Sequence, residues 1–285
     1  MPDAAIDTHC HVISPDLARY PRAPIGGHQS DWSKERPVDV EEMVAAMDAA
    51  GIAKSVLVQA STCYGHDNSY VAAAIAAHPR RFTGVFSIDV LADDARGEMR
   101  RWIDKGFTGM RLFTTGSTMA GQQLGWLDDP RSFPAWDYAG ERGIPICLQM
   151  TAKAIPQVIT LLERFPQIRV VLDHAARPSL EDGPPYAAAA SLWSLAKYGN
   201  LYLKVTPHNF LEARRGKASP ESFFKQAVAE FGAARIAWGS NFPAAAGTLT
   251  ALRTMAEECF AALTPGERAA IFHATALALY PALAA

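Results

Sequence analysis

The sequence has few of the features that mark the most easily recognised protein classes. Its 285 residues include only four cysteines, and no two of them are spaced as Cys-x-x-Cys. No apolar run approaches the ~20 residues needed to cross a bilayer. The first residues, which include Asp3, lack the apolar stretch of a secretory signal. We therefore expect reduced thiols without disulfide bridges and a protein located in the cytoplasm.

An excess of either charge is also missing. The 27 Lys and Arg residues nearly balance the 29 Asp and Glu residues, which leaves a formal net charge of −2. The longest basic run, Arg214–Lys217, is flanked by small and polar residues and indicates a solvated loop. This balance argues against nucleic acid or an anionic membrane as the main partner. The expected partner is a small-molecule substrate, and association into a homo-oligomer stays open.

The sequence does contain a regular alternation of short apolar runs with longer, alanine-rich segments of helical period. The short runs predict eight strands, at Ala5–Val12, Ser55–Ala60, Thr83–Ile88, Gly109–Phe113, Ile144–Met150, Arg169–Ala175, Leu201–Val205 and Ile236–Asn241. The longer segments predict nine helices, at Val40–Ala50, Asn68–His78, Asp94–Lys105, Phe133–Arg142, Ala154–Phe165, Pro185–Lys197, Pro220–Phe231, Thr248–Cys259 and Pro265–Ala276.

Strict alternation of strands and helices implies a parallel sheet. Eight such units in a chain of this length fit a single α/β domain over residues 1–285, a regular or distorted (β/α)8 TIM-type barrel. An open, doubly wound sheet is the alternative, but it would show a glycine fingerprint after the first strand, where this chain has "HCHV". The segment Ser14–Pro37 is a long loop after the first strand and is expected to form a lid or a wall of the site.

In a barrel of this kind the active site lies at the C-terminal ends of the strands. His9 and His11 end the first strand and point to the same side, while Cys10 points to the helix layer and Asp7 lies one layer deeper. Polar residues also end or follow other predicted strands: Arg111, Gln149, His174, Arg177, Lys204, His208, Asn209 and Asn241.

Arg111 would need an anionic partner in such a place, because a buried unpaired guanidinium is costly. That partner is either a substrate carboxylate or a protein carboxylate such as Asp7 or Asp89. Lys204 fits either a functional role or an ion pair within the strand.

These segments resemble the amidohydrolase superfamily. The resemblance rests on "DTHCHV", "LDHAARP", "NLYLKV" and "WGSNFP" at strands one, six, seven and eight, in that order. "VQASTCYGHDNSYV", which contains His66, and "GMRLF" are similar to its branch of 2-pyrone-4,6-dicarboxylate lactonases and sugar lactonases. The resemblance implies a (β/α)8 barrel that hydrolyses a lactone or a similar ester.

Carried over to this chain, the resemblance makes His9, His11 and His174 candidate ligands of one divalent metal ion, zinc above all, with a metal-free site as the alternative. Three departures limit it. Arg111 stands where a bridging lysine or glutamate would serve two metals, Gln149 stands where histidine is common, and Asn241 stands where an aspartate is expected. A carboxamide cannot accept a proton near neutral pH, so the general base would be His174 or His208.

The sequence therefore predicts a hydrolase that opens an anionic lactone, such as a pyrone-dicarboxylate-like or sugar-acid lactone. Its catalytic residues would be His9, His11, His174 and Asn241. Substrate would be bound by Arg111, Arg177, Gln149, His66 and His208. A metal-dependent decarboxylase of the same superfamily and a non-catalytic binding barrel are the alternatives, the second because Asn241 replaces the aspartate.

Overall fold

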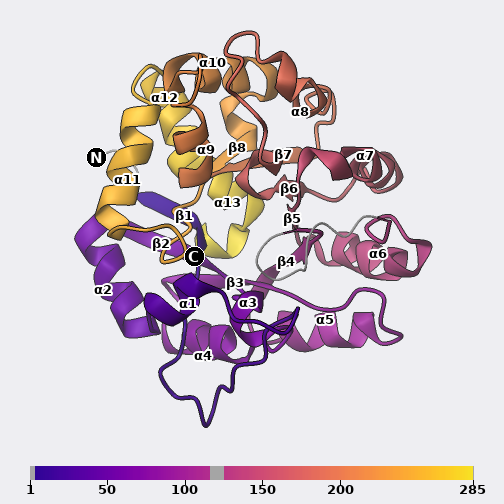
Figure 1. The fold of residues 1–285 in the computed structure, drawn as a ribbon. Coiled ribbons are helices and arrows are strands. Elements are labelled where there is room, and N and C mark those ends of the chain that lie inside the picture. The colour runs from indigo at the N-terminus through magenta and orange to yellow at the C-terminus, as the bar shows by residue number, and fades with distance from the viewer. Residues whose placement is uncertain (1–3, 116–124, 285) are drawn as a thin grey trace.

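A computed structural model describes residues 4–115 and 125–284, and these form the predicted barrel (Figure 1). All strand pairs are parallel, and the strands lie in the order of the sequence. They are β1 (Ala5–Cys10), β2 (Ile52–Val58), β3 (Phe82–Phe86), β4 (Phe107–Phe113), β5 (Ile146–Gln149), β6 (Val170–Leu172), β7 (Leu201–Val205) and β8 (Ile236–Trp238).

The barrel is closed between β1 and β8 mainly by the chain just beyond the end of β8. The backbone N–H of Asn241 donates to the carbonyl of His9 at 2.7 Å, and that of His11 donates to the carbonyl of Phe242 at 2.8 Å. The hydroxyl of Thr8 donates to the carbonyl of Trp238 at 2.6 Å. These bonds place Asn241 beside the two histidines of the first strand.

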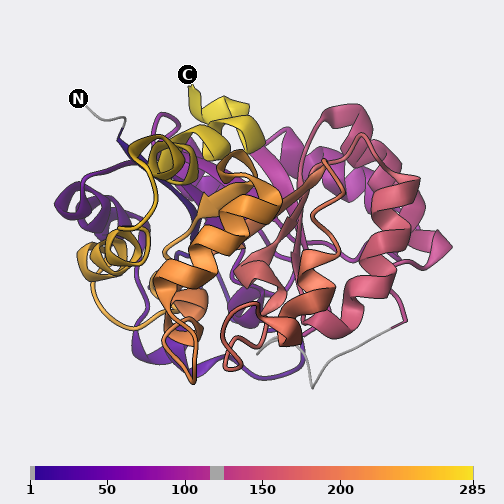
Figure 2. The same ribbon diagram turned by 90° about the horizontal axis from the view of Figure 1, so that it is seen from above.

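Helices cover the outside of the barrel (Figures 1 and 2). Seven correspond to predicted ones: α2 (Val40–Ala50), α4 (Ser69–Ala77), α5 (Ala95–Ile103), α6 (Phe133–Arg142), α7 (Ile155–Arg164), α10 (Pro220–Phe231) and α11 (Leu249–Cys259). Capping residues in the sequence explain where these helices begin and end. Gly51 ends α2 in the left-handed region at φ 64°, and the Ser219 side chain accepts from the backbone of Ser222 at the start of α10.

The predicted helix Pro185–Lys197 was wrong. Only the short helices η4 (Ala187–Ala189) and α8 (Ala190–Trp193) form there. Tyr186 adopts a left-handed conformation at φ 57°, and its ring is fully buried with its hydroxyl 2.6 Å from the Ser222 Oγ atom. Burial of the Tyr186 ring in the core outweighs the helix propensity of the alanines that follow, so no long helix forms here.

The strands and loops at the mouth also differ from the prediction. Strands β6 and β8 end three residues before their predicted ends, and β1 ends two residues before. Within the described residues, three short α-helices that the sequence did not predict follow strands at this end: α1 (Asp31–Glu35) after β1, α3 (Ser61–Tyr64) after β2 and α9 (Pro207–Glu212) after β7. Local hydrophobic periodicity carries little information over four to six residues, so such elements are decided by packing.

The C-terminal segment seals the other end of the barrel. It comprises α12 (Pro265–Ala269), the π-helical turn η6 (Ala270–Ala274), α13 (Thr275–Leu279) and η7 (Pro281–Ala284), close to the predicted last helix. Leu279, Tyr280 and Leu283 pack onto interior residues such as Ile6 and Val171. Full burial of a leucine such as Leu279 stabilises the fold by about 1.5–3 kcal/mol. Figure 2 shows both termini at this end. Among the described helices, none is long and apolar enough to span a membrane.

Candidate active site

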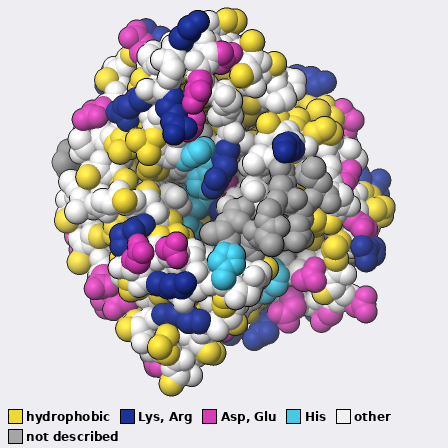
Figure 3. All heavy atoms as spheres, viewed as in Figure 1, with side chains coloured by type: hydrophobic (Ala, Val, Ile, Leu, Met, Phe, Trp, Pro, Cys, Tyr) yellow, Lys and Arg dark blue, Asp and Glu magenta, His cyan; other side chains and the backbone are white. Residues whose placement is uncertain are grey.

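A cavity of about 430 Å3 lies at the C-terminal ends of the strands. Figure 3 shows histidine and basic side chains around a hollow near the middle of this face. The size falls in the range of small-molecule sites. Twelve residues line it: His11, Trp32, Gln59, Ala60, Ser61, Thr62, Arg111, Gln149, His174, Arg177, Asn241 and Ala244. The sequence thus predicted six of these lining residues as site residues: His11, Arg111, Gln149, His174, Arg177 and Asn241. Trp32 comes from α1, within the segment predicted as a long loop after β1, and this segment forms a wall of the cavity as expected.

The two histidines of the first strand have different surroundings. His11 lines the cavity, and its Nδ1 atom lies 2.7 Å from the Val58 carbonyl. A carbonyl only accepts, so Nδ1 carries the proton and Nε2 is left as the acceptor of the ring. Burial, reinforced by the charge of Arg111, lowers the pKa of His11 to about 4. His9 is fully buried and its ring lies 5.0 Å from that of His11 and 5.3 Å from that of His174.

Asp173 is the central charge beneath the cavity, and sequence reasoning missed it. Its Oδ2 atom accepts from Arg111 Nε at 2.7 Å, and its Oδ1 atom forms an ion pair with Lys204 Nζ, 2.8 Å away. His9 Nδ1 lies 3.6 Å from the same Oδ1 atom. Burial alone would raise the pKa of Asp173, but Lys204 and Arg111 outweigh it and hold that pKa well below the usual range.

This arrangement corrects the expected protein partner of Arg111 and shows that Lys204 forms an ion pair. The protein carboxylate that pairs with Arg111 is Asp173, not Asp7 or Asp89. Lys204 is indeed ion-paired within the barrel. The sequence could have indicated Asp173 as the partner of these cations, because Asp173 directly precedes the candidate site residue His174. Two cations on β4 and β7, both pointing into one barrel interior, require a nearby carboxylate.

His174 and Arg177 are presented by a left-handed turn at the end of β6. Residues 174–177 have φ values of 55°, 48°, 58° and 53°, and none of them is glycine. Each such residue costs roughly 1–2 kcal/mol, so the turn must be held in place. The side chain of Asn209 donates to the carbonyl of His174 at 2.8 Å, and the Thr206 hydroxyl lies 2.7 Å from His174 Nδ1. Strain of this kind is typical of functional sites.

Arg111 and Arg177 bring guanidinium groups with free outer nitrogens to the cavity wall, as far as the described residues show. Arg111 is 6% exposed and uses only its Nε atom, on Asp173, so its two outer nitrogens have no acceptor among the described residues. The Arg177 side chain makes no hydrogen bond or ion pair within that same part of the chain. Burial, with some repulsion from Arg111, lowers the pKa of Arg177. Two guanidinium groups facing one cavity favour an anionic ligand.

Asn241 lines the cavity in a left-handed conformation at φ 53°, which asparagine tolerates better than most residues. Its neighbour Ser240 is turned away from the cavity, and its hydroxyl and backbone N–H both donate to the Asp7 carboxylate. Asp7 also accepts from the backbone N–H of His9. Burial raises the pKa of Asp7 to about 6. Asp7 therefore fixes the junction between β1 and β8, where it positions His9 and Asn241.

Both histidines that were predicted to bind substrate, His66 and His208, are absent from the lining of this cavity. His66 lines a neighbouring cavity, where its Nδ1 atom is 2.8 Å from the Ser87 hydroxyl. His208 lies on α9, and its ring is 6.3 Å from that of His174. Gln149, predicted together with them, does line the main cavity.

The donor set does not fit a metal centre. Within residues 4–115 and 125–284, no group of three or more His, Cys, Asp or Glu side chains is arranged to hold an ion. The carboxylate beside the His9 ring, that of Asp173, is already paired with two cations, Arg111 and Lys204. A divalent ion here would meet both positive charges at short range. The three-histidine zinc site expected from the sequence is therefore not supported by this arrangement.

A family model with the description "Amidohydrolase" matches residues 6–282. The chain belongs to the amidohydrolase family. The order of the site residues agrees with this membership: the His-x-His pair ends β1, the histidine follows β6, and residue 241 follows β8.

Two relatives are similar to the chain in sequence, and one solved structure is similar to it in fold. L-fucono-1,5-lactonase of Burkholderia ambifaria is 27% identical over 86% of this chain and 84% of its own length. The 2-pyrone-4,6-dicarboxylate hydrolase of Comamonas testosteroni is 25% identical over 85% and 78%. A crystal structure of a putative 2-pyrone-4,6-dicarboxylic acid hydrolase of Pseudomonas putida superposes with a TM-score of 0.78, at 24% identity over 98% of each chain.

Proposed function

We propose that this chain is a hydrolase that opens the ring of a carboxylated lactone by attack of water. One observation carries the proposal: Arg111 and Arg177 line the same cavity as His11 and His174, and their outer nitrogens have no acceptor in the described chain. The two relatives supply the reaction class, since both are named for the hydrolysis of lactones.

The arginines would bind the substrate carboxylate and so fix the lactone carbonyl above His9 and His174. Arg111 is itself held through Asp173 and Lys204. Because these groups are buried and already oriented, they need little rearrangement as negative charge develops on the carbonyl oxygen. The positive charge at the wall would stabilise the oxyanion formed when water adds to the carbonyl carbon.

The attacking water would lie between Asn241 and an uncharged imidazole. Burial holds the pKa values of His11 and His174 below the ordinary value, so both rings are neutral near pH 7. The bare Nε2 atom of His11 would accept the proton of the water, and Asn241, on the adjoining chain, would orient it. His174, the base expected from the sequence, is the second candidate. The proton then passes to the ring oxygen as the ester bond breaks.

No step in this scheme is routed through a metal, because the donor set does not fit one. The scheme leaves two earlier alternatives as outcomes of the test. A decarboxylase would release carbon dioxide from an aromatic acid and lose activity with a chelator, and a binding barrel would bind carboxylated lactones without turnover. A cytoplasmic location stays a prediction, and association into a homo-oligomer stays open.

The test is a lactone panel with and without a ring carboxylate, assayed with and without a chelator. We expect hydrolysis of the carboxylated lactones, unaffected by the chelator. Arg177→Gln should raise KM for a carboxylated lactone by at least ten-fold and leave KM for a neutral lactone within two-fold, since one arginine–carboxylate contact is worth roughly 1.5–3 kcal/mol. Arg80→Gln, at an exposed position before β3, is the matched control. Inactivity on every carboxylated lactone would refute the proposal.

A further inference from the structure

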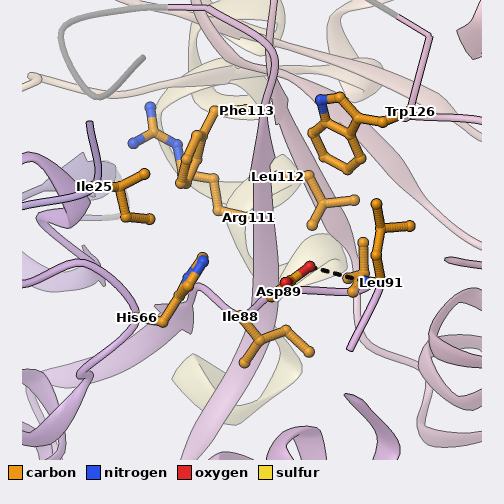
Figure 4. Close-up of a pocket in the computed structure, with 10 residues that line it drawn as sticks. Ile25, His66, Ile88, Asp89, Leu91, Arg111, Leu112, Phe113 and Trp126 are labelled. Atoms are coloured by element: carbon orange, nitrogen blue, oxygen red, sulfur yellow. Dashed lines mark hydrogen bonds between the residues drawn. The ribbon is translucent and has the colours of Figure 1, made fainter. Parts of the chain in front are cut away.

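A second cavity of about 260 Å3 adjoins the first, and Arg111 lines both. Figure 4 shows its walls: Ile25 and His66 on one side, Leu91 and Trp126 on the other, and Phe113 beside Arg111. Ile88 closes it from below in this view. The cavity therefore begins at the group that is proposed to hold the substrate carboxylate.

The lining of this second cavity is mainly apolar and adds little positive charge. Burial lowers the pKa of His66, whose ring is stacked on that of Phe113 with centroids 6.4 Å apart, so His66 is neutral near pH 7. The Asp89 carboxylate is turned to the backbone N–H of Leu91 at 2.9 Å and is solvent-exposed. Arg111 is thus the strong cationic group of the wall, and it stands at the junction with the main cavity.

We propose that the second cavity binds an apolar substituent, alkyl or aryl, of the carboxylated lactone that is opened in the first. This inference rests on the proposed function and narrows its substrate class. The size is sufficient, because an apolar cavity of about 150 Å3 already binds benzene. A polyhydroxylated sugar lactone fits the lining poorly, since its hydroxyl groups would lose their water and face Phe113 and Trp126 unpaired.

The first experiment compares two carboxylated five-membered lactones that differ only in a methyl or a phenyl substituent. We expect wild-type kcat/KM to be at least ten-fold higher for the phenyl compound, in line with the roughly 10- to 200-fold that a single methylene contributes in an apolar pocket. Leu91→Trp, which fills the cavity, should reduce this phenyl-to-methyl ratio at least ten-fold. Leu17→Trp is the matched control, because Leu17 is 58% exposed and lines neither cavity, and it should leave the ratio unchanged.

A second measurement needs neither turnover nor a variant. Calorimetry on the wild-type protein compares phenylsuccinate with methylsuccinate, and at least ten-fold tighter binding of phenylsuccinate is expected. Equal kcat/KM for the two lactones together with equal affinity for the two succinates would overturn the apolar subsite and leave the proposed function standing. If neither lactone is hydrolysed, the succinate comparison still decides on the subsite, and only inactivity on every carboxylated lactone of the panel overturns the proposed function.

Discussion

Lys204 Nζ lies 2.8 Å from Asp173 Oδ1, and both side chains are fully inaccessible to solvent. Arg111 holds the other oxygen of the same carboxylate. This three-residue network joins strands β4 and β7 to the turn after β6, directly beneath the cavity. Removing one partner of a buried ion pair leaves the other charged and desolvated, so the network ties the stability of the barrel to the geometry of the site.

Lys204→Met should therefore destabilise the protein strongly. The substitution keeps most of the volume but leaves Asp173 with one cation, and the expected loss is about 3–5 kcal/mol in the free energy of unfolding. Urea denaturation measures it. The matched control is Lys225→Met, because the Lys225–Glu221 pair is equally short at 2.7 Å but exposed, and its loss should cost less than about 1 kcal/mol. Similar losses in the two variants would contradict the network.

Stability should also fall in mild acid because of the buried imidazoles. The folded pKa of His11 is depressed to about 4, below an unfolded value of about 6.5, so the unfolded chain binds the proton first as the pH drops. The contribution of His11 is fully present above pH 6.5 and is lost as the pH falls toward 4. His9 and His174 act in the same direction.

Asp7 works against this trend, because its folded pKa is raised to about 6 and its ionisation costs stability as the pH rises.

Comparison of the wild type with His11→Gln isolates the contribution of His11 to the pH dependence of stability. Unfolding by urea between pH 4.5 and 7.5 should give a slope for wild type that is steeper than for the variant by up to about 1.4 kcal/mol per pH unit. Parallel slopes would show that folding does not lower the pKa of His11.

Asn241 is predicted to orient the water and not to accept its proton. Asn241→Ala should then lower kcat by roughly 10- to 100-fold, the loss typical of a positioning contact. Asn241→Gly tests the same side chain without placing a Cβ atom at φ 53° and should show a similar loss. Asn241→Asp should raise the affinity for zinc in a calorimetric titration. An inert wild type with an active Asn241→Asp variant would mean that the barrel is kept for binding.

The left-handed turn after β6 predicts an unusual response to glycine. Ala176 has φ 58°, so Ala176→Gly relieves backbone strain while losing one buried methyl group. Ala227 is equally buried but lies inside α10, where glycine costs about 1 kcal/mol in helix propensity on top of the lost methyl. We expect Ala176→Gly to be less destabilising than Ala227→Gly by roughly 1–2 kcal/mol in thermal or urea unfolding. The reverse order would argue against the turn.

The sequence alone determined the barrel and most of its mouth. Alternating strand and helix periods predicted eight parallel strands, and the rule that strand ends converge predicted that His11, Gln149, His174 and Asn241 share one cavity. Those inferences succeed because hydrophobic periodicity and strand direction are local properties of the chain.

Only the tertiary structure decided which charge faces which. The pairing of Arg111 with Asp173 joins residues 62 positions apart and depends on the left-handed turn that follows β6, which no helix or strand pattern encodes. The separation of His66 into an apolar side cavity depends in the same way on how the loops after β2 and β3 pack. The position of a residue at a strand end predicts that its side chain reaches the mouth of the barrel. Which group it pairs with there depends on how distant segments pack. In the low dielectric of the interior, a buried charge without a partner is costly, so this pairing has a large effect on stability.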